Sequence, residues 1–306
     1  MSEQILKLQQ GIRQAIHGKN DVIDDVLCAL LAQGHILLED IPGVGKTTLV
    51  TALAKVMNLS YKRIQFTPDV LPSDLTGFTM LNKETGKFTY HKGAVHTNLF
   101  LADEINRTSP KTQSALLEVM EEGHVTVDGV TYDLPSPFLV IATQNPIGTS
   151  GTQKLPESQL DRFMVRLSMG YPNHNSAIDI LKGDSHKTIK NLEPVVSLDD
   201  IVKMQQECEL VHVSDSLYEY AVSLTEATRD SETFLLGLSP RGSIALLKMA
   251  KAHAYLHGND FVSPEDFRDT FLPIANHRVI LSTKAKASGL TVEAALSKAF
   301  QTVSVP

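Results

Sequence analysis

Cysteine is scarce in this chain of 306 residues. Its two cysteines, Cys28 and Cys208, lie far apart, and neither belongs to a Cys-x-x-Cys pair. Disulfide frameworks need several cysteines and zinc knuckles need closely spaced ones, so we expect neither here. Cysteine usage of this kind is typical of a reducing cytoplasm, which is the location that we expect.

Long apolar segments are missing as well. Residues 26–38 carry no charge, but Gln33, Gly34 and His35 interrupt the apolar run. A helix that spans a membrane needs about 20 consecutive apolar residues. The first residues, MSEQILKLQQGIRQ, lack the basic start and apolar stretch of a signal peptide. We therefore expect no membrane span and no secretory leader.

Neither half of the chain has an excess of positive charge. The net charge is −7; residues 1–171 hold 15 Lys+Arg against 18 Asp+Glu, and residues 172–306 hold 13 against 17. A nucleic-acid-binding domain usually has a clear basic bias, so nucleic acid is not the expected partner. A local basic groove, built by oligomerisation, stays open as an alternative. With 42% hydrophobic and 21% charged residues, the composition excludes a largely disordered chain.

Two kinds of pattern divide the chain near residue 171. Before it, apolar spacings predict helices near 5–16, 22–30, 47–57 and 110–122 and strands near 36–38, 61–66, 98–102, 138–143 and 164–167. After it, helical stretches follow near 175–182, 198–210, 214–228, 240–256, 264–275 and 292–300. Strands that alternate with helices favour a parallel sheet covered on both faces. We therefore predict an α/β domain over 1–171 and a small all-helical domain over 172–306.

A glycine-rich loop is the most specific local motif. It reads Gly43-Val44-Gly45-Lys46-Thr47-Thr48, between a predicted strand and a predicted helix. Glycines let backbone N–H groups curl around phosphate oxygens, and the helix N-terminus adds positive potential. Lys46 would reach the β- and γ-phosphates, and the Thr47 hydroxyl would bind Mg²⁺. The segment is therefore predicted to bind the phosphates of a nucleotide.

One residue departs from the strict phosphate-loop pattern, which begins with glycine. This chain has Asp40 at that position. Aspartate tolerates positive φ better than most residues, so we expect the turn to survive with Asp40 in this position, although its entry geometry stays open.

Polar residues follow two of the predicted strands. Asp103 and Glu104 follow residues 98–102, and Asn145 follows residues 138–143. Ligands of parallel sheets sit at the carboxyl ends of strands, so Asp103 would orient Mg²⁺, Glu104 would polarise the attacking water and Asn145 would hold that water. Taken alone, each pattern also fits a solvated strand end or a turn at Asn145-Pro146. The phosphate loop upstream makes us favour the catalytic interpretation.

These motifs, together with their context, resemble the MoxR family of AAA+ ATPases over nearly the whole chain. The most specific stretches are residues 101–122, the Val125-Thr-Val-Asp-Gly129 turn, Ala142-Thr-Gln-Asn-Pro146 and Leu155-Pro-Glu-Ser-Gln-Leu-Asp-Arg-Phe163. In that resemblance Walker A falls on the residues from Gly43 to Thr47, Walker B on Asp103 and Glu104, and sensor 1 on Asn145. The resemblance implies a P-loop NTPase fold of the AAA+ type, followed by a helical lid.

The resemblance also implies roles for arginines. Arg162 lies in the segment that resembles the arginine finger, which reaches a neighbouring subunit's nucleotide, and Arg241 in the one that resembles sensor 2. A salt bridge from Arg162 to Asp161, or a surface position for Arg241, are the alternatives. Arg107 is a second candidate for the finger. Arg278 is expected on the surface of the lid.

Further segments acquire expectations from the same resemblance. Residues 77–98 resemble the insert within helix 2 of this clade, and residues 124–134 the hairpin before sensor 1; both usually face the pore of a ring. Ile16-His17-Gly18-Lys19 resembles the segment that packs on adenine, which makes Gly18 a binding residue, whereas Lys19 stands where glutamine is more common and its contact stays open. His253 and His257 lack a third ligand, so we expect no metal there.

The implied function is ATP hydrolysis, with ATP and Mg²⁺, in a homo-oligomeric ring that is expected to be hexameric. Such a ring would remodel protein clients, among which proteins with a von Willebrand factor A domain are expected. Three alternatives remain: a motor on nucleic acid, a nucleotide-dependent assembly switch or scaffold, and the motor subunit of a magnesium chelatase, which would need a porphyrin-binding partner. The client, the pathway and the ring size are not specified by the sequence.

Overall fold

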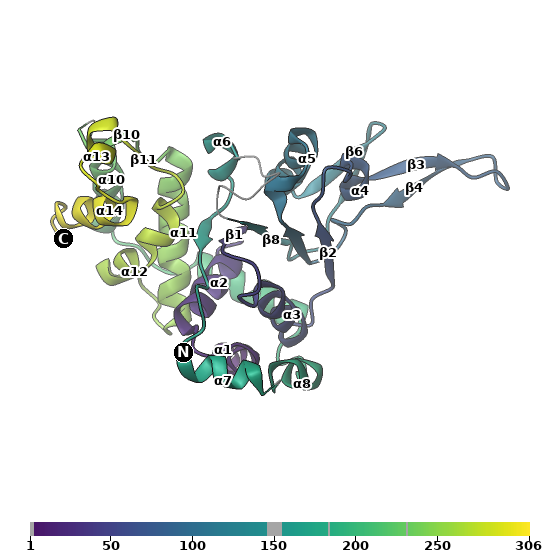
Figure 1. Ribbon diagram of the computed structural model, residues 1–306, viewed down its shortest axis with the longest axis horizontal. Helices are drawn as coiled ribbons and strands as arrows, with labels where there is room; N and C mark the ends of the chain where they lie inside the picture. The colour runs from purple at the N-terminus through teal and green to yellow at the C-terminus, as the bar shows by residue number, and fades with distance from the viewer. Residues whose placement is uncertain (1–2, 146–154, 183, 231) are drawn as a thin grey trace.

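A computed structural model describes residues 3–145, 155–182, 184–230 and 232–306, arranged as an α/β core beside a helical lid (Figure 1). The core contains, in chain order, α1 (Glu3–Ala15), α2 (Asn20–Leu31), β1 (Ile36–Glu39), α3 (Lys46–Val56), β2 (Tyr61–Gln65), α4 (Pro72–Thr76), β3 (Gly77–Leu81), β4 (Phe88–Lys92), β5 (Leu99–Asp103), the 3-10 turn η1 (Ile105–Arg107), α5 (Pro110–Glu122), β6 (His124–Val127), β7 (Val130–Asp133), β8 (Leu139–Gln144), α6 (Glu157–Leu160) and β9 (Val165–Leu167).

Helices dominate the remainder of the chain, as the sequence predicts. They are α7 (His174–Leu181), α8 (Asp184–Asn191), α9 (Leu198–Glu209), α10 (Asp215–Ala227), α11 (Pro240–Leu256), α12 (Pro264–Ala275), α13 (Thr283–Ala287) and α14 (Val292–Gln301). A short antiparallel pair, β10 (Phe234–Leu236) with β11 (Ile280–Leu281), is an addition that the sequence patterns did not predict. Helices α7 and α8 pack on each other and α8 on α1 and α3, so the boundary at 171/172 stays a prediction.

A five-stranded parallel sheet organises the core, in the order β2-β5-β8-β1-β9. Because every strand runs the same way, the residues that follow β1, β5 and β8 meet at one edge of the sheet. We call this the phosphate-loop edge, since the glycine-rich loop after β1 lies there. The residues that precede β1 and β8 lie at the opposite edge.

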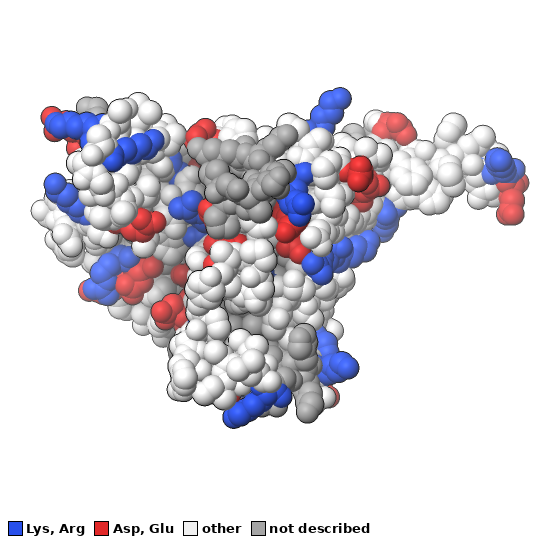
Figure 2. Space-filling view, viewed as in Figure 1, with Lys and Arg blue, Asp and Glu red and all other residues white. Residues whose placement is uncertain are grey.

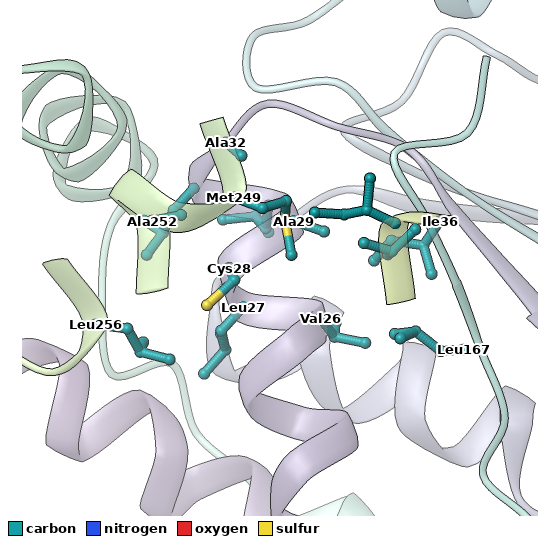
Figure 3. Packing of buried hydrophobic residues seen from close by; sticks show 14 of the residues in the cluster. Val26, Leu27, Cys28, Ala29, Ala32, Ile36, Leu167, Met249, Ala252 and Leu256 are labelled. Atoms are coloured by element: carbon teal, nitrogen blue, oxygen red, sulfur yellow. The ribbon is translucent and has the colours of Figure 1, made fainter. Parts of the chain in front are cut away.

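Alternation along the strands places apolar side chains on both faces of the sheet. Ile36 and Leu38 of β1 join a buried cluster with α1, α2, α3 and the lid, whereas Leu37 faces a second cluster with α4 and α5. Figure 3 shows the first cluster at the junction with the lid, where Cys28 and Ala29 of α2 lie beside Met249 of α11. Buried apolar contacts therefore join the lid to the core.

Local signals set the ends of the helices that carry the site. Ser109 caps α5, accepting a hydrogen bond from the Thr112 amide, and Gly123 ends the helix with φ 68°. Ser239 caps α11 in the same way and Pro240 occupies its first turn.

The segment that resembles the helix insert forms the β3–β4 hairpin, which projects away from the body of the molecule (Figure 1). At its base the ring of Tyr90 stacks on Tyr132 of the β6–β7 hairpin, with ring centres 3.9 Å apart. Across the described ranges, every helix is too short or too polar to cross a bilayer.

Candidate nucleotide-binding site

The glycine-rich loop leaves β1 and leads directly into α3. Gly43 and Gly45 have φ of 86° and 96°, in the left-handed region that side chains rarely adopt. The Lys46 ammonium lies over the loop and donates hydrogen bonds to the carbonyl oxygens of Asp40, at 2.7 Å, and Ile41, at 3.4 Å. Burial lowers the pKa of Lys46, and nearby carboxylates act in the opposite direction. The loop therefore has a backbone that can surround an anion and a cation beside it.

The turn before α3 is kept with Asp40 at its entry, and Asp40 is not among the residues with positive φ. Its side chain is buried and its carboxylate accepts hydrogen bonds from Ser168 Oγ at 2.8 Å, Met169 N at 2.6 Å and Gly170 N at 3.1 Å. The residue is therefore an anchor for another segment and not a glycine substitute.

Asp103 lies at the end of β5, beside the loop. One of its carboxylate oxygens accepts a hydrogen bond from Thr143 Oγ1 at 2.6 Å, and the other pairs with Arg63 Nη2 at 2.6 Å. Oxygen donors of this kind suit Mg²⁺, which proteins usually hold with one or two carboxylates together with substrate phosphates. Asp103 and the Thr47 hydroxyl thus fit the expected metal by their chemistry.

Glu104 is held by three donors on neighbouring elements. Asn145 Nδ2 lies 3.0 Å from one carboxylate oxygen; Arg107 Nη1 and Gln65 Nε2 lie 2.7 Å and 3.3 Å from the other. Burial acts to raise the pKa of Glu104, but these hydrogen bonds outweigh it and hold that pKa below its usual value. Glu104 is therefore an oriented, ionised carboxylate at neutral pH.

A hollow of about 320 Å³ brings the predicted residues together; it is lined by Pro42, Gly43, Gly45, Lys46, Thr47, Thr48, Arg63, Asp103, Glu104 and Asn145. Sequence reasoning missed two participants, Arg63 and Gln65 of β2. The sequence did contain a signal for them, because both are polar side chains at alternate positions of a predicted strand. Only the strand register, which sets Gln65 opposite Asp103, shows that this strand lies beside the site. Pro146, the last residue of the sensor 1 motif, lies outside the described residues.

An adjoining hollow of about 250 Å³ is more apolar. It is lined by Ala15, Ile16, His17, Lys19, Gly43, Val44, Gly45, Thr48, Met169, Pro172, Ser176 and Ile180. Gly18 has φ 70°, and a Cβ there would lie 2.6 Å from Asn173 Nδ2, so this position requires glycine for close packing. Lys19 donates a hydrogen bond to the Tyr171 carbonyl at 2.8 Å and so closes one wall. An apolar hollow next to a phosphate loop has the character of a base-binding pocket.

Arg162 and Arg241 lie elsewhere, at the opposite edge of the sheet. Both guanidinium groups pair with the Glu121 carboxylate near the end of α5: Arg162 at 3.2 Å, and Arg241 through the other oxygen. They line a hollow of about 400 Å³ that also contains His35, directly before β1. We call this the arginine edge. Since β1 separates the edges by about 13 Å, neither arginine is brought to this chain's own phosphate loop.

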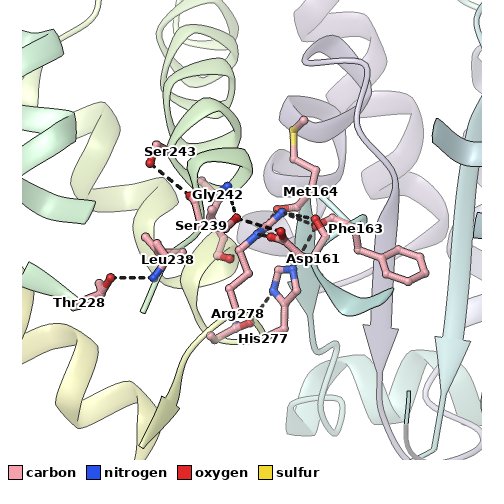
Figure 4. Close-up of polar contacts among 12 residues, drawn as sticks. Asp161, Phe163, Met164, Thr228, Leu238, Ser239, Gly242, Ser243, His277 and Arg278 are labelled. Atoms are coloured by element: carbon pink, nitrogen blue, oxygen red, sulfur yellow. Dashed lines mark hydrogen bonds and ion pairs between the residues drawn. The ribbon is translucent and has the colours of Figure 1, made fainter. Parts of the chain in front are cut away.

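Arg278 was expected on the surface, and this expectation is wrong. Its side chain is buried, pairs with the Asp161 carboxylate at 2.7 Å and donates to the carbonyl oxygens of Phe163 and Met164 at 2.6 Å and 2.9 Å (Figure 4). His277 Nε2 also bonds to the Phe163 carbonyl, at 3.0 Å. The turn that follows α12 therefore fixes the segment that carries Arg162, and Asp161 pairs with Arg278 and not with Arg162.

The two lid histidines, His253 and His257, form hydrogen bonds with protein groups. His253 Nδ1 lies 2.7 Å from an Asp266 carboxylate oxygen, and His257 Nδ1 lies 2.8 Å from the His253 carbonyl. Among the residues that the structure describes, no group of three or more His, Cys, Asp or Glu side chains could hold a metal ion.

Comparison with known proteins agrees with this geometry. Residues 35–165 match the family model "ATPase family associated with various cellular activities (AAA)", and residues 226–299 match the AAA lid domain. A crystal structure of a Cytophaga hutchinsonii protein, described as an ATPase candidate, superposes with a TM-score of 0.88 at 38% identity, over 99% of this chain and 97% of that one. The P-loop NTPase fold with a helical lid, expected from the sequence, is confirmed.

Full-length relatives narrow the family further. The chain is 50% identical to the uncharacterized protein YeaC of Bacillus subtilis, over 98% of this chain and 94% of that protein. It is 36% identical to the chaperone MoxR1 of Mycobacterium tuberculosis, over 96% of this chain and 80% of that one, and 29% identical to the protein MoxR of Methylorubrum extorquens, over 98% and 94%. The chain is similar to these relatives over nearly its whole length, and its core and lid match the AAA models. It therefore belongs to the MoxR family of AAA+ ATPases.

Proposed function

We propose that this protein hydrolyses ATP to ADP and phosphate. The observation that carries this proposal is the single hollow in which Lys46, Asp103, Glu104 and Asn145 meet, next to an apolar hollow that fits a base. Phosphoryl transfer needs mainly positioning and charge stabilisation, and these side chains supply both.

Each residue has a role that follows from its place. Backbone N–H groups of residues 43–48 and the Lys46 ammonium bind the phosphates. Thr47 and Asp103 would hold Mg²⁺, which would neutralise negative charge on the phosphates. The ionised Glu104 carboxylate accepts a proton from the attacking water, and Asn145, bonded to Glu104 at 3.0 Å, orients both.

A neighbouring subunit completes the site. Arg162 and Arg241 lie together at the arginine edge, away from this chain's own phosphate loop, which supports a role on another molecule's phosphates. Arg107, by contrast, pairs with this chain's own Glu104 at 2.7 Å, which favours Arg162 over Arg107 as the residue that acts in trans. We therefore infer a closed homo-oligomeric ring. The family resemblance favours six subunits, and the cysteine usage of the sequence favours a cytoplasmic location.

We propose that the ATPase acts on other proteins, its clients. The relative MoxR1 is named a chaperone, and the β3–β4 hairpin offers the exposed apolar side chains Phe78, Met80 and Phe88, with Phe88 75% exposed. In Figure 2 this hairpin is largely white, with charged side chains at its tip. An exposed apolar hairpin of this kind suits contact with an unfolded or partly folded protein. From the family resemblance, we propose that the clients include proteins with a von Willebrand factor A domain.

Nucleic acid is the weaker candidate for the molecule on which the ATPase acts. The net charge is −7, and positive and negative side chains are interspersed over the face in Figure 2. DNA that stimulates ATP hydrolysis, with a steep loss of the effect as salt rises, would reverse this order.

The decisive experiment measures phosphate release from ATP across the concentrations at which subunits assemble. We expect the activity per subunit to rise steeply and then to saturate, because Arg162 reaches the nucleotide only between subunits. Constant activity per subunit across assembly would contradict action in trans.

A second experiment identifies the client. Glu104→Gln protein would be isolated in the presence of ATP, and the proteins bound to it would be compared with those bound to Lys46→Ala. Proteins that bind both variants equally would not be clients.

A further inference from the structure

Asp40 makes contacts that a phosphate loop with glycine at this position lacks. Its side chain is only 6% exposed, and its carboxylate accepts three hydrogen bonds from consecutive residues: the hydroxyl of Ser168 and the amides of Met169 and Gly170. A buried carboxylate close to an anion-binding loop is unfavourable unless donors compensate it. Here the donors all come from one segment, the exit from β9.

The same segment forms a wall of the apolar hollow. Met169 and Pro172 line that hollow, and Met169 Cε lies 3.8 Å from the position that a Cβ of Gly45 would occupy. Lys19 secures the next carbonyl, that of Tyr171, from the other side. The wall thus stands directly over the glycine-rich loop.

Asp40 is connected to the phosphate-binding side as well. Its own carbonyl oxygen accepts a hydrogen bond from the Lys46 ammonium at 2.7 Å. One residue therefore touches the cation that would bind the phosphates and, through its carboxylate, the wall that would bind the base.

We propose that Asp40 is a positioning residue that fixes the distance between the phosphate loop and the base-binding wall. This role rests on the proposed function as an ATP hydrolase. A ligand that uses both hollows, such as a nucleoside triphosphate, depends on that distance, whereas a ligand that uses only the loop does not. Asp40 would thus determine how strongly the protein prefers a nucleotide to bare polyphosphate.

The test compares two probes, ATP and inorganic tripolyphosphate, each with Mg²⁺. Titration calorimetry would give both dissociation constants for the full-length wild type and for Asp40→Asn, whose amide N–H₂ must face one of the three donors. We expect ATP binding to weaken about tenfold, as one charge-assisted hydrogen bond is lost and one donor is left unsatisfied, while tripolyphosphate binding changes less than about threefold. The KM for ATP should rise with kcat nearly unchanged.

Two further variants keep the test informative if Asp40→Asn folds poorly. Asp40→Gly restores the common phosphate-loop residue, removes all three hydrogen bonds to the wall and should show a larger selective loss. Ser168→Ala removes one donor and leaves both backbone bonds, so a smaller selective loss is expected. Equal weakening for both probes, or none for either, would overturn the positioning role alone. Wild-type protein that binds neither probe would overturn the proposed function together with this role.

Discussion

The two edges of the central sheet differ in how their charged groups are satisfied. At the phosphate-loop edge, Glu104 is held by three donors and Asp103 by two. At the arginine edge, Arg162 and Arg241 share the single carboxylate of Glu121 and remain 31% and 43% exposed. The phosphate-loop edge is organised to receive a ligand, whereas the two guanidinium groups of the arginine edge share one carboxylate among the residues that the structure describes.

This difference has an energetic consequence. Exposed ion pairs contribute about 0–1 kcal/mol, so exchanging the pairs with Glu121 for a phosphate of a second subunit, as we propose, would cost little free energy. An arginine that acts in trans contributes about 10³–10⁵ in rate, which corresponds to roughly 4–7 kcal/mol of barrier. The contacts at the arginine edge are therefore weak enough to be replaced in the ring that we propose.

The largest expected effects come from breaking the phosphate-loop edge. Lys46→Ala should abolish ATP binding, because the ammonium is the loop's own cation. Glu104→Gln should keep ATP binding within a few-fold and lose hydrolysis by about 10²–10⁴, since the amide does not accept the proton from water. Fluorescent-nucleotide titration and phosphate release would separate the two. Normal hydrolysis by Glu104→Gln would assign the proton acceptor elsewhere.

Removing an arginine from the arginine edge should also stop ATP hydrolysis, but subunits of a second variant should restore part of the activity. Arg162→Ala should lose about 10³-fold or more in kcat with ATP affinity nearly unchanged. Mixing it with Lys46→Ala subunits, which keep their arginines but lack a nucleotide site, should restore part of the activity. Arg107→Ala mixed in the same way serves as the control and should not be rescued. Mixed rings without recovery would refute the division of the site.

The lid contact next to Arg162 gives a third, smaller effect, on stability. Arg278→Ala removes a buried guanidinium and leaves the Asp161 carboxylate without its cation, so we expect a loss of about 3–5 kcal/mol in the free energy of unfolding. Arg241→Ala, which removes a half-exposed guanidinium, should cost less than about 1 kcal/mol. Urea unfolding of both variants would measure the difference. Equal losses would mean that the two arginines are held alike.

The sequence predicted the phosphate-loop edge well because that edge is built from local signals. Strands that end in Asp103 and Asn145, and glycines that open α3, are visible within a few residues of chain. Helix ends marked by Ser109 and Ser239 were equally legible. Burial and hydrogen bonding then follow from the parallel order of the strands.

The sequence did not predict contacts between distant segments. The environment of Arg278 comes from Asp161 and Phe163, more than 100 residues earlier, and nothing in its own neighbourhood indicates burial. The hydrogen bonds of Asp40 were not foreseen for the same reason, since its partners lie on the exit from β9. The β10–β11 pair is only two to three residues long on each side, too short for a periodic pattern.

The last predicted effect concerns how stability at the arginine edge depends on pH. His35, at the arginine edge, accepts a hydrogen bond from the Val140 amide at its Nδ1, 3.0 Å away, and its Nε2 lies 2.9 Å from the Met120 carbonyl. Burial lowers the pKa of His35 to about 4, so the folded protein keeps this ring neutral while the unfolded chain binds a proton below about pH 6.5.

The free energy of unfolding should therefore fall as the pH drops from 6.5 to 4, by about 2–3 kcal/mol from this residue. In His35→Gln, which keeps a donor and an acceptor, that part of the pH dependence should vanish, although the variant is less stable at neutral pH. Urea unfolding of both proteins at pH 7.5, 6 and 5 would give the two slopes. Parallel slopes would show that His35 does not titrate with unfolding, and the acid sensitivity would then belong to other groups, of which the buried His277 is the first to test, because burial lowers its pKa too.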